Sequence, residues 1–134
     1  MSEKQFDELQ KHIVEKHPGS EIQVSSIAGG ANMIKITQVA LPVGWNRQSA
    51  DIIFVAPPGY PTTAPDCFWI EPSGFRLEGG GTPQNSNDSN PIPGDIMSGR
   101  ATTWFSWHVQ GWNPNRNTLR GFFQLILNRL DPAR

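Results

Sequence analysis

Two segments, one toward each end of the chain, carry apolar residues at the spacing of an amphipathic helix. In residues 2–17 these residues form one stripe between Glu, Lys and Gln positions: Phe6, Leu9 and Ile13, with Val14 as a further candidate. In residues 117–130, where Asn117 is the predicted N-cap, the apolar face is wider: Leu119, Phe122, Phe123, Ile126, Leu127 and Leu130. The pattern predicts one helix at each end.

Between these helices, shorter apolar segments are typical of strands. Four strands are predicted: 22–27, 33–41, 51–56 and 67–70. The first alternates as a half-buried strand does and forms a hairpin with the second, whereas the third is a continuous apolar run that indicates burial on both faces. A four-stranded antiparallel meander followed by a long loop and a C-terminal helix packed on the sheet is an α+β fold.

The second half of the chain contains the least regular segments. Residues 57–66 hold four prolines and a glycine and predict a stiff loop rather than a helix or a strand. Residues 72–100 are mostly Gly, Pro, Ser and Asn, and we expect a long flexible loop within a single domain that spans residues 1–134. Residues 102–109 are aromatic and are predicted to be extended.

Composition and charge exclude several classes of function. The 134 residues include 11 Lys plus Arg and 12 Asp plus Glu, a formal net charge of −1 that predicts no nucleic-acid or membrane surface. No apolar run is long enough to span a membrane and the polar start is unlike a signal peptide, so we expect a cytoplasmic protein. The single cysteine, Cys67, excludes an internal disulfide.

Two motifs, in this order of elements, resemble the ubiquitin-conjugating enzyme (E2/UBC) superfamily. Gly59–Asp66 reads GYPTTAPD, which looks like the YPxxPP loop of those enzymes, and Trp112-Asn113-Pro114 ahead of the last helix looks like their W-S-P turn. The nearest pattern is that of the bacterial E2-like group, family E type. The resemblance implies an E2/UBC-like fold and a place beside ubiquitin-like proteins, E1-like adenylating enzymes and modifier-specific peptidases.

The chain also departs from the E2 pattern. The HPN tripeptide is absent, and Trp104–His108, which reads WFSWH where the family carries its cysteine, has no thiol. The chain therefore resembles E2 relatives that lack the usual catalytic cysteine. Whether it is an enzyme stays open: if active, it is a modifier transferase without a catalytic cysteine, and the alternative is a non-catalytic E2-variant-like adaptor or peptide-binding module.

Ser106 and His108 are the candidate catalytic residues. In an extended segment, residues two apart point to the same face, so the hydroxyl and the imidazole are expected to be neighbours. A serine needs an adjacent base to act as a nucleophile, and histidine is the natural base near neutral pH. Such a pair could carry a modifier as an oxyester, although a histidine beside two tryptophans is more often structural.

The other candidate groups favour structure or binding over catalysis. Cys67 opens a predicted strand beside an anion and aromatics, which favours a buried, unreactive thiol. No familiar ligand spacing is present, so we expect no metal and no cofactor. Residues of the proline loop and of the aromatic segment are the predicted modifier- or partner-binding residues: Tyr60, Pro61, Asp66, Trp104, Trp107 and Trp112.

Overall fold

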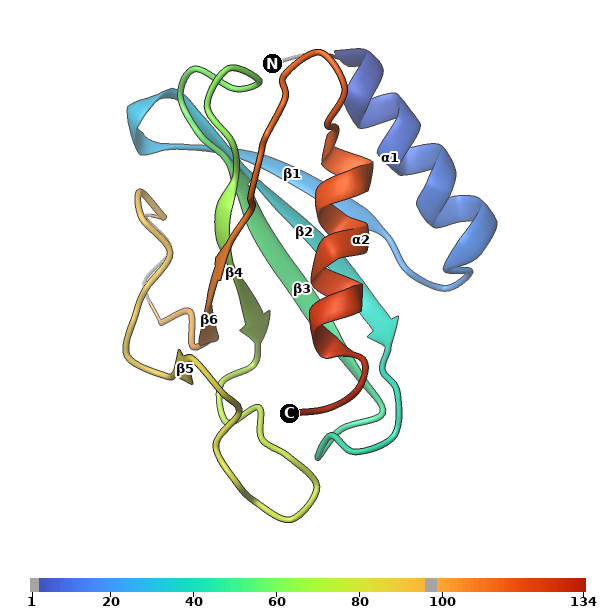
Figure 1. Ribbon diagram of the computed structural model, residues 1–134, viewed down its shortest axis with the longest axis vertical. Helices are drawn as coiled ribbons and strands as arrows, with labels where there is room; N and C mark the ends of the chain where they lie inside the picture. The colour runs from blue at the N-terminus through green and yellow to red at the C-terminus, as the bar shows by residue number, and fades with distance from the viewer. Residues whose placement is uncertain (1–2, 96–98) are drawn as a thin grey trace.

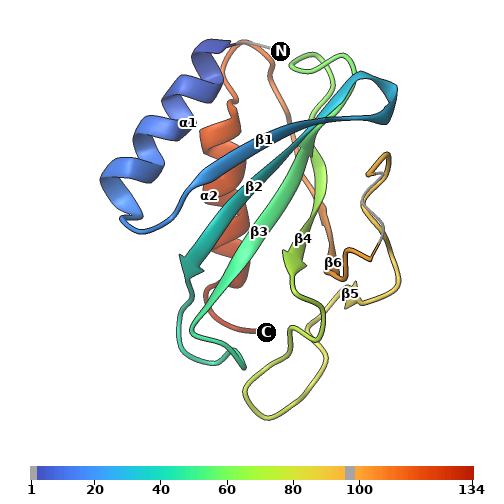
Figure 2. The same ribbon diagram turned by 180° about the vertical axis from the view of Figure 1, so that it is seen from behind.

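A computed structural model describes residues 3–95 and 99–134. The elements follow one another as α1 (Glu3–Lys16), β1 (Ile22–Ile27), the one-turn 3₁₀ helix η1 (Ala28–Gly30), β2 (Ala31–Ala40), β3 (Ser49–Ala56), β4 (Asp66–Glu71), β5 (Ser86–Asn87), β6 (Thr103–His108) and α2 (Leu119–Leu130). The strands form one antiparallel sheet in the order β1-β2-β3-β4-β6-β5. Both helices lie on the same face of this sheet (Figures 1 and 2).

The predicted α+β class is confirmed, with a meander between an N-terminal and a C-terminal helix as in a UBC-like fold. The sheet is wider than the predicted four strands because the aromatic segment pairs with β4 as strand β6, and β5 then pairs with β6. Position 2 of the predicted first helix lies outside the described residues.

Two local predictions are wrong. The strand β1 is not half-buried: Val24 is 44% exposed, because β1 lies at the edge of the sheet, where it has a neighbouring strand on one side only. The N-cap of α2 is Thr118, whose side chain accepts a hydrogen bond from the Gly121 N–H. Asn117 instead accepts from the Asn113 N–H at 2.6 Å, because it closes the turn ahead of the helix.

The sheet separates two apolar cores. The larger lies under the helices, where the predicted apolar residues of α1 and α2, except Val14, which is 64% exposed, meet alternate residues of the strands. It contains fully buried rings from distant parts of the chain: Phe54, Phe68, Phe75, Phe105, Phe122 and Phe123. The smaller lies on the opposite face and consists of Met33, Ile53, Cys67, Trp69 and Ile92. We call these the helix face and the open face of the sheet.

The described residues of the segment 72–100 contribute to both cores. Phe75 is fully buried on the helix face, and Ile92 is 4% exposed on the open face. The segment also contains β5 and is held by the Trp69 indole N–H, which donates to the Asn90 carbonyl oxygen at 2.9 Å. Its part over residues 90–94 therefore forms one wall of the open face.

Candidate functional site

The candidate site lies where β4 begins and β6 ends. The two strands pair so that Asp66 is opposite His108 and Phe68 is opposite Phe105. Between these pairs, the single residue Cys67 faces two residues of β6, which makes a β-bulge. Bulges redirect side chains, and here polar side chains from two segments distant in the sequence lie together at the same end of the sheet.

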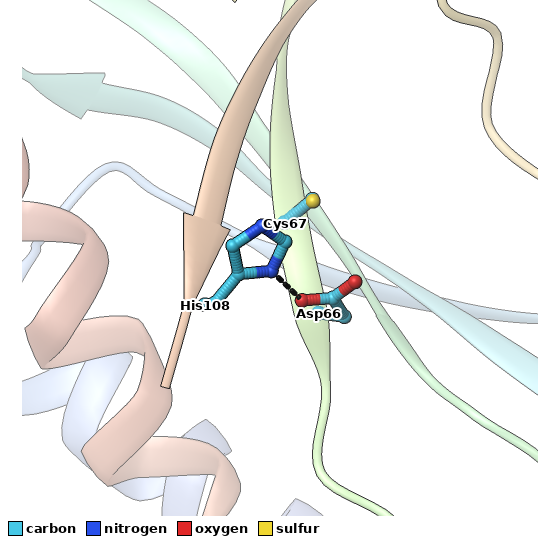
Figure 3. Close-up of side chains that lie close together, drawn as sticks. All are labelled: Asp66, Cys67 and His108. Carbon is cyan, nitrogen blue, oxygen red and sulfur yellow. Dashed lines mark hydrogen bonds and ion pairs between the residues drawn. The ribbon is translucent and has the colours of Figure 1, made fainter. Parts of the chain in front are cut away.

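Three side chains at this bulge form a connected polar chain. His108 Nδ1 lies 2.5 Å from Asp66 Oδ1, and His108 Nε2 lies 3.3 Å from Ser106 Oγ. A carboxylate can only accept a hydrogen bond, so Nδ1 carries the proton and, in the neutral ring, Nε2 has the free lone pair. The Ser106 hydroxyl then donates toward Nε2. Figure 3 shows the imidazole of His108 directed at Asp66.

We call this chain, Ser106–His108–Asp66, the relay. Its residues are arranged like the nucleophile, base and orienting carboxylate of acyl-transfer sites on unrelated folds. The Ser106 contact is longer than a strong hydrogen bond, as such contacts often are before a substrate is bound. Chemically, His108 Nε2 can accept the Ser106 proton while Ser106 Oγ attacks a carbonyl carbon.

The relay is open to solvent. The side chains of His108 and Asp66 are 61% and 65% exposed, and Ser106 is half-buried. A hydrogen-bonded pair this exposed contributes little to stability, because water competes for it and screens it. The exposure leaves room for a large partner to reach the relay.

Cys67 lies beside the relay but is buried, with 7% of its surface exposed. Burial raises the pKa of its thiol above the ordinary value, and the Asp66 charge acts in the same direction; hydrogen bonds from the Trp107 backbone and the Trp104 side chain oppose them. Its backbone has a φ of 64°, a left-handed conformation that is costly for a residue with a side chain. Burial and the raised pKa therefore disfavour the thiol as a nucleophile.

A cavity of about 430 Å³ adjoins the relay on the open face. Asp66 and Cys67 lie in its wall. The rest of the lining is mostly apolar and comes from the sheet, the proline loop and residues 90–94: Ala28, Ala31, Val55, Pro57, Pro58, Thr63, Ala64, Trp69, Asn90, Pro91, Pro93, Gly94 and Trp104. A small or apolar group of a ligand can enter this cavity beside the relay.

The structure separates the predicted binding residues into two groups and a sixth residue, Trp107, that belongs to neither. Asp66 and Trp104 lie at the relay and the cavity, respectively. Tyr60, Pro61 and Trp112 form a corner elsewhere: Tyr60 is 8% exposed and its hydroxyl donates to Gln5 Oε1, and the Trp112 indole N–H donates to the Pro61 carbonyl oxygen at 2.8 Å. These contacts hold the proline loop against α1 and the turn before α2.

The remaining predicted binding residue, Trp107, points to the helix face, where it packs against the larger core. Its indole N–H is buried without a hydrogen-bond partner among the described residues. This placement favours packing over partner binding for Trp107.

The pairing of Ser106 with His108 is predictable from the sequence, whereas the contacts of Asp66 and Cys67 with His108 are not. The missing signal is the pairing of β4 with β6, which no short motif contains, because it depends on two segments separated by residues 72–100. Asp66, predicted as a binding residue of the proline loop, lies at the third position of the relay.

Comparison with known proteins assigns the family. No curated protein and no solved structure shows a significant match to this chain. The family described as "Prokaryotic E2 family E" matches residues 11–133, which include both sequence motifs, the bulge and the whole relay. Among the described residues, no helix is long and apolar enough to cross a bilayer. The chain is a bacterial E2-like protein that belongs to prokaryotic E2 family E.

Proposed function

We propose that this protein is the E2-like component of a bacterial ubiquitin-like conjugation pathway, that it binds a ubiquitin-like modifier and its E1-like activating enzyme, and that it carries the modifier as an oxyester on Ser106. Membership of prokaryotic E2 family E supports a general role in such a pathway. The observation that supports the carrier role is the relay, in which Ser106 Oγ lies 3.3 Å from a histidine nitrogen whose other nitrogen contacts a carboxylate.

The proposed step balances as an acyl transfer. Ser106 Oγ attacks the carbonyl carbon of the modifier's C-terminal acyl group, held by the E1-like partner as a thioester or an acyl adenylate. The Oγ–C bond forms, the bond to the sulfur or phosphate leaving group breaks, and the Ser106 proton passes to His108 Nε2. The Asp66 carboxylate stabilises the resulting imidazolium, which can return the proton to the leaving group.

The location of the relay is compatible with a macromolecular donor. The exposed Asp66 and His108 side chains leave the approach to Ser106 open, and the adjoining cavity can take part of the modifier's C-terminal segment. A thiol in the same role would be Cys67, but burial and the raised pKa disfavour it.

The test is reconstitution with ATP and with the E1-like and ubiquitin-like proteins from the same genome, followed by intact-mass spectrometry. We expect an adduct that alkali removes, that is lost in Ser106→Ala and that becomes sensitive to thiols in Ser106→Cys. Ser25→Ala, on the exposed edge strand β1, is the matched control and should retain the adduct. Asp66→Asn should slow adduct formation by on the order of 10²-fold.

Two results would overturn the carrier role. An adduct on Cys67 that persists in Ser106→Ala would transfer the role to the thiol. No adduct at all, together with measurable binding of the modifier, would leave the second candidate function, a non-catalytic E2-variant-like adaptor or peptide-binding module. The observation that favours that candidate is the largely apolar cavity beside a rigid proline loop.

A further inference from the structure

The same bulge that builds the relay also gathers a mixed set of metal-ligating atoms. One ligand atom each from Asp66, Cys67 and His108 lies within 4.8 Å of the other two. Figure 3 shows the three side chains around the start of β4, with His108 reaching across from β6. Thiol, imidazole and carboxylate together form a donor set that suits zinc rather than magnesium or calcium.

We propose that Asp66, Cys67 and His108 form a three-ligand site for a thiophilic divalent cation, Zn²⁺ in the first place. Tetrahedral zinc bonds of about 2.0–2.3 Å bring ligand atoms to roughly 3.3–3.7 Å from one another, so separations near the 4.8 Å limit have to shorten by about 1 Å, whereas Asp66 Oδ1 and His108 Nδ1, now 2.5 Å apart, have to separate. The side chains of Asp66 and His108 are well exposed and can move once their mutual hydrogen bond opens, whereas Cys67 is buried.

The bulge holds the sulfur near the end of β6, because Cys67 faces the two residues that precede His108. Cys67 is 7% exposed and lines the cavity. Metal ligation requires the thiolate, so a bound cation would displace the Cys67 proton.

The site would keep an open coordination position. Three protein ligands leave the fourth position of a tetrahedral zinc to water or to another group. Asp66 and Cys67 also line the cavity of about 430 Å³ on the open face, which gives both the cation and an exogenous ligand a path to the site.

Zinc binding to His108 excludes proton transfer from Ser106 to His108. This consequence rests on the proposed function. A neutral imidazole has one nitrogen with a free lone pair. If the cation binds Nε2, it takes the lone pair that faces Ser106; if it binds Nδ1, the proton moves to Nε2. In both cases His108 can no longer accept the Ser106 proton, so bound zinc switches the acyl transfer off.

Cobalt(II) titration of the full chain, freed of metal beforehand, tests the site without any need for acyl transfer. We expect one Co²⁺ per chain, with a near-ultraviolet thiolate-to-cobalt charge-transfer band that Zn²⁺ abolishes by displacement. Cys67→Ser should remove this band. His108→Gln and Asp66→Asn, which change exposed side chains, should each weaken Zn²⁺ binding by about 100-fold or more in competition with a chromophoric chelator.

Two controls distinguish zinc bound at the bulge from zinc bound elsewhere on the chain. His17→Gln removes a histidine that lies next to His12 at the end of α1, with ring centroids 5.6 Å apart, and should leave Zn²⁺ affinity unchanged. Ser106→Ala should also retain the full affinity while losing the acyl adduct. A cobalt spectrum with no thiolate band, or an affinity that falls in His17→Gln and not in His108→Gln, would overturn the metal site.

Inhibition is measured separately, as the rate of adduct formation with and without Zn²⁺. We expect zinc to suppress the adduct in the wild-type chain and to lose most of this effect in Cys67→Ser, each variant being compared with its own zinc-free rate. Adduct formation that is unaffected by saturating zinc would refute the exclusion. If no adduct forms at all, the carrier role fails while the cobalt and zinc titrations still decide the metal site.

Discussion

The helix face and the open face of the same sheet are built in opposite ways. Under the helices, aromatic and aliphatic side chains from every part of the fold are fully buried and in mutual contact. On the open face, a small core lies next to a cavity, and the polar groups at the strand ends are more than half exposed. Stability needs the first arrangement, because burial of apolar surface is its main source.

The strand β6 contributes side chains to both faces of the sheet. In β6, Phe105 belongs to the helix-face core, whereas Trp104 packs with the open-face core and Ser106 contacts His108. Alternation of side chains along a strand lets one segment hold the fold together and present reactive groups at once. Substitutions on the two faces should therefore affect different properties.

Phe105→Ala is expected to have the largest effect on stability. The Phe105 ring is fully buried, stacks on Phe68 with centroids 4.8 Å apart, and lies 5.0 Å from the Arg129 guanidinium carbon. Truncating a buried phenylalanine lowers the free energy of unfolding by about 3–5 kcal/mol, through lost transfer energy and the cavity left behind. Urea unfolding measures it.

Val55→Ala is the matched change on the open face, where Val55 is half-buried beside the smaller core. We expect it to lower the free energy of unfolding by about 1 kcal/mol. If Val55→Ala destabilised the chain as much as Phe105→Ala, the contrast between the two faces would be wrong.

Thr103→Val is expected to rank second, because it breaks the junction between β6 and the segment of residues 72–100. The buried Thr103 Oγ1 accepts a hydrogen bond from the Phe75 N–H at 3.1 Å and donates one to Asp88 Oδ1 at 2.6 Å. Valine has a similar shape but leaves the buried Phe75 N–H without its partner and removes one of the hydrogen bonds to Asp88, which costs about 1–3 kcal/mol. Thr62→Val, at an exposed position of the proline loop, should change stability by less than about 0.5 kcal/mol. Equal losses in the two variants would show that the Thr103 contacts do not stabilise the fold.

Asp88 adds a pH dependence at the same junction. Its hydrogen bond from Arg76 is the main cause that holds the pKa of this carboxyl below its usual value of 3.8. A lowered folded-state pKa means stability that is present above pH 3.8 and is lost as the pH falls through the folded-state pKa. In Asp88→Asn we therefore expect a shallower loss of unfolding free energy below about pH 4. Asp7→Asn, on the exposed side of α1, is the control; an acid profile of Asp88→Asn as steep as that of the wild type would contradict the assignment.

Local patterns predicted the parts of the fold that local physics determines. The wide apolar face of α2 and the continuous apolar run of β3 follow from residue spacing alone, and both lie buried apart from the half-buried Leu127 and Val55. The exposure of β1 and the choice of Thr118 over Asn117 as N-cap depend on neighbours that the spacing does not contain.

The candidate site shows the same limit. Ser106 and His108 are two residues apart, so an extended segment is enough to place them together. The contact of Asp66 with His108 and the proximity of Cys67 arise from strand pairing across residues 72–100 and from a bulge in its register. The burial of Ile92, in a segment expected to be flexible, likewise depends on how that segment crosses the open face.

Variants of the relay should have the smallest effect on stability. They are therefore the strictest test of the contrast between the helix face and the open face. Ser106→Ala, His108→Gln and Asp66→Asn change side chains that are exposed or half-buried, and the pair they break is screened by water. We expect each to alter the free energy of unfolding by less than about 0.5 kcal/mol in urea denaturation. The same three changes are the ones expected to abolish or slow the acyl adduct. A loss above about 1 kcal/mol in any of them would mean that the open face contributes to stability through the relay itself. Stability and chemistry would then not be divided between the two faces, and reduced adduct formation in these variants could reflect unfolding rather than loss of the base.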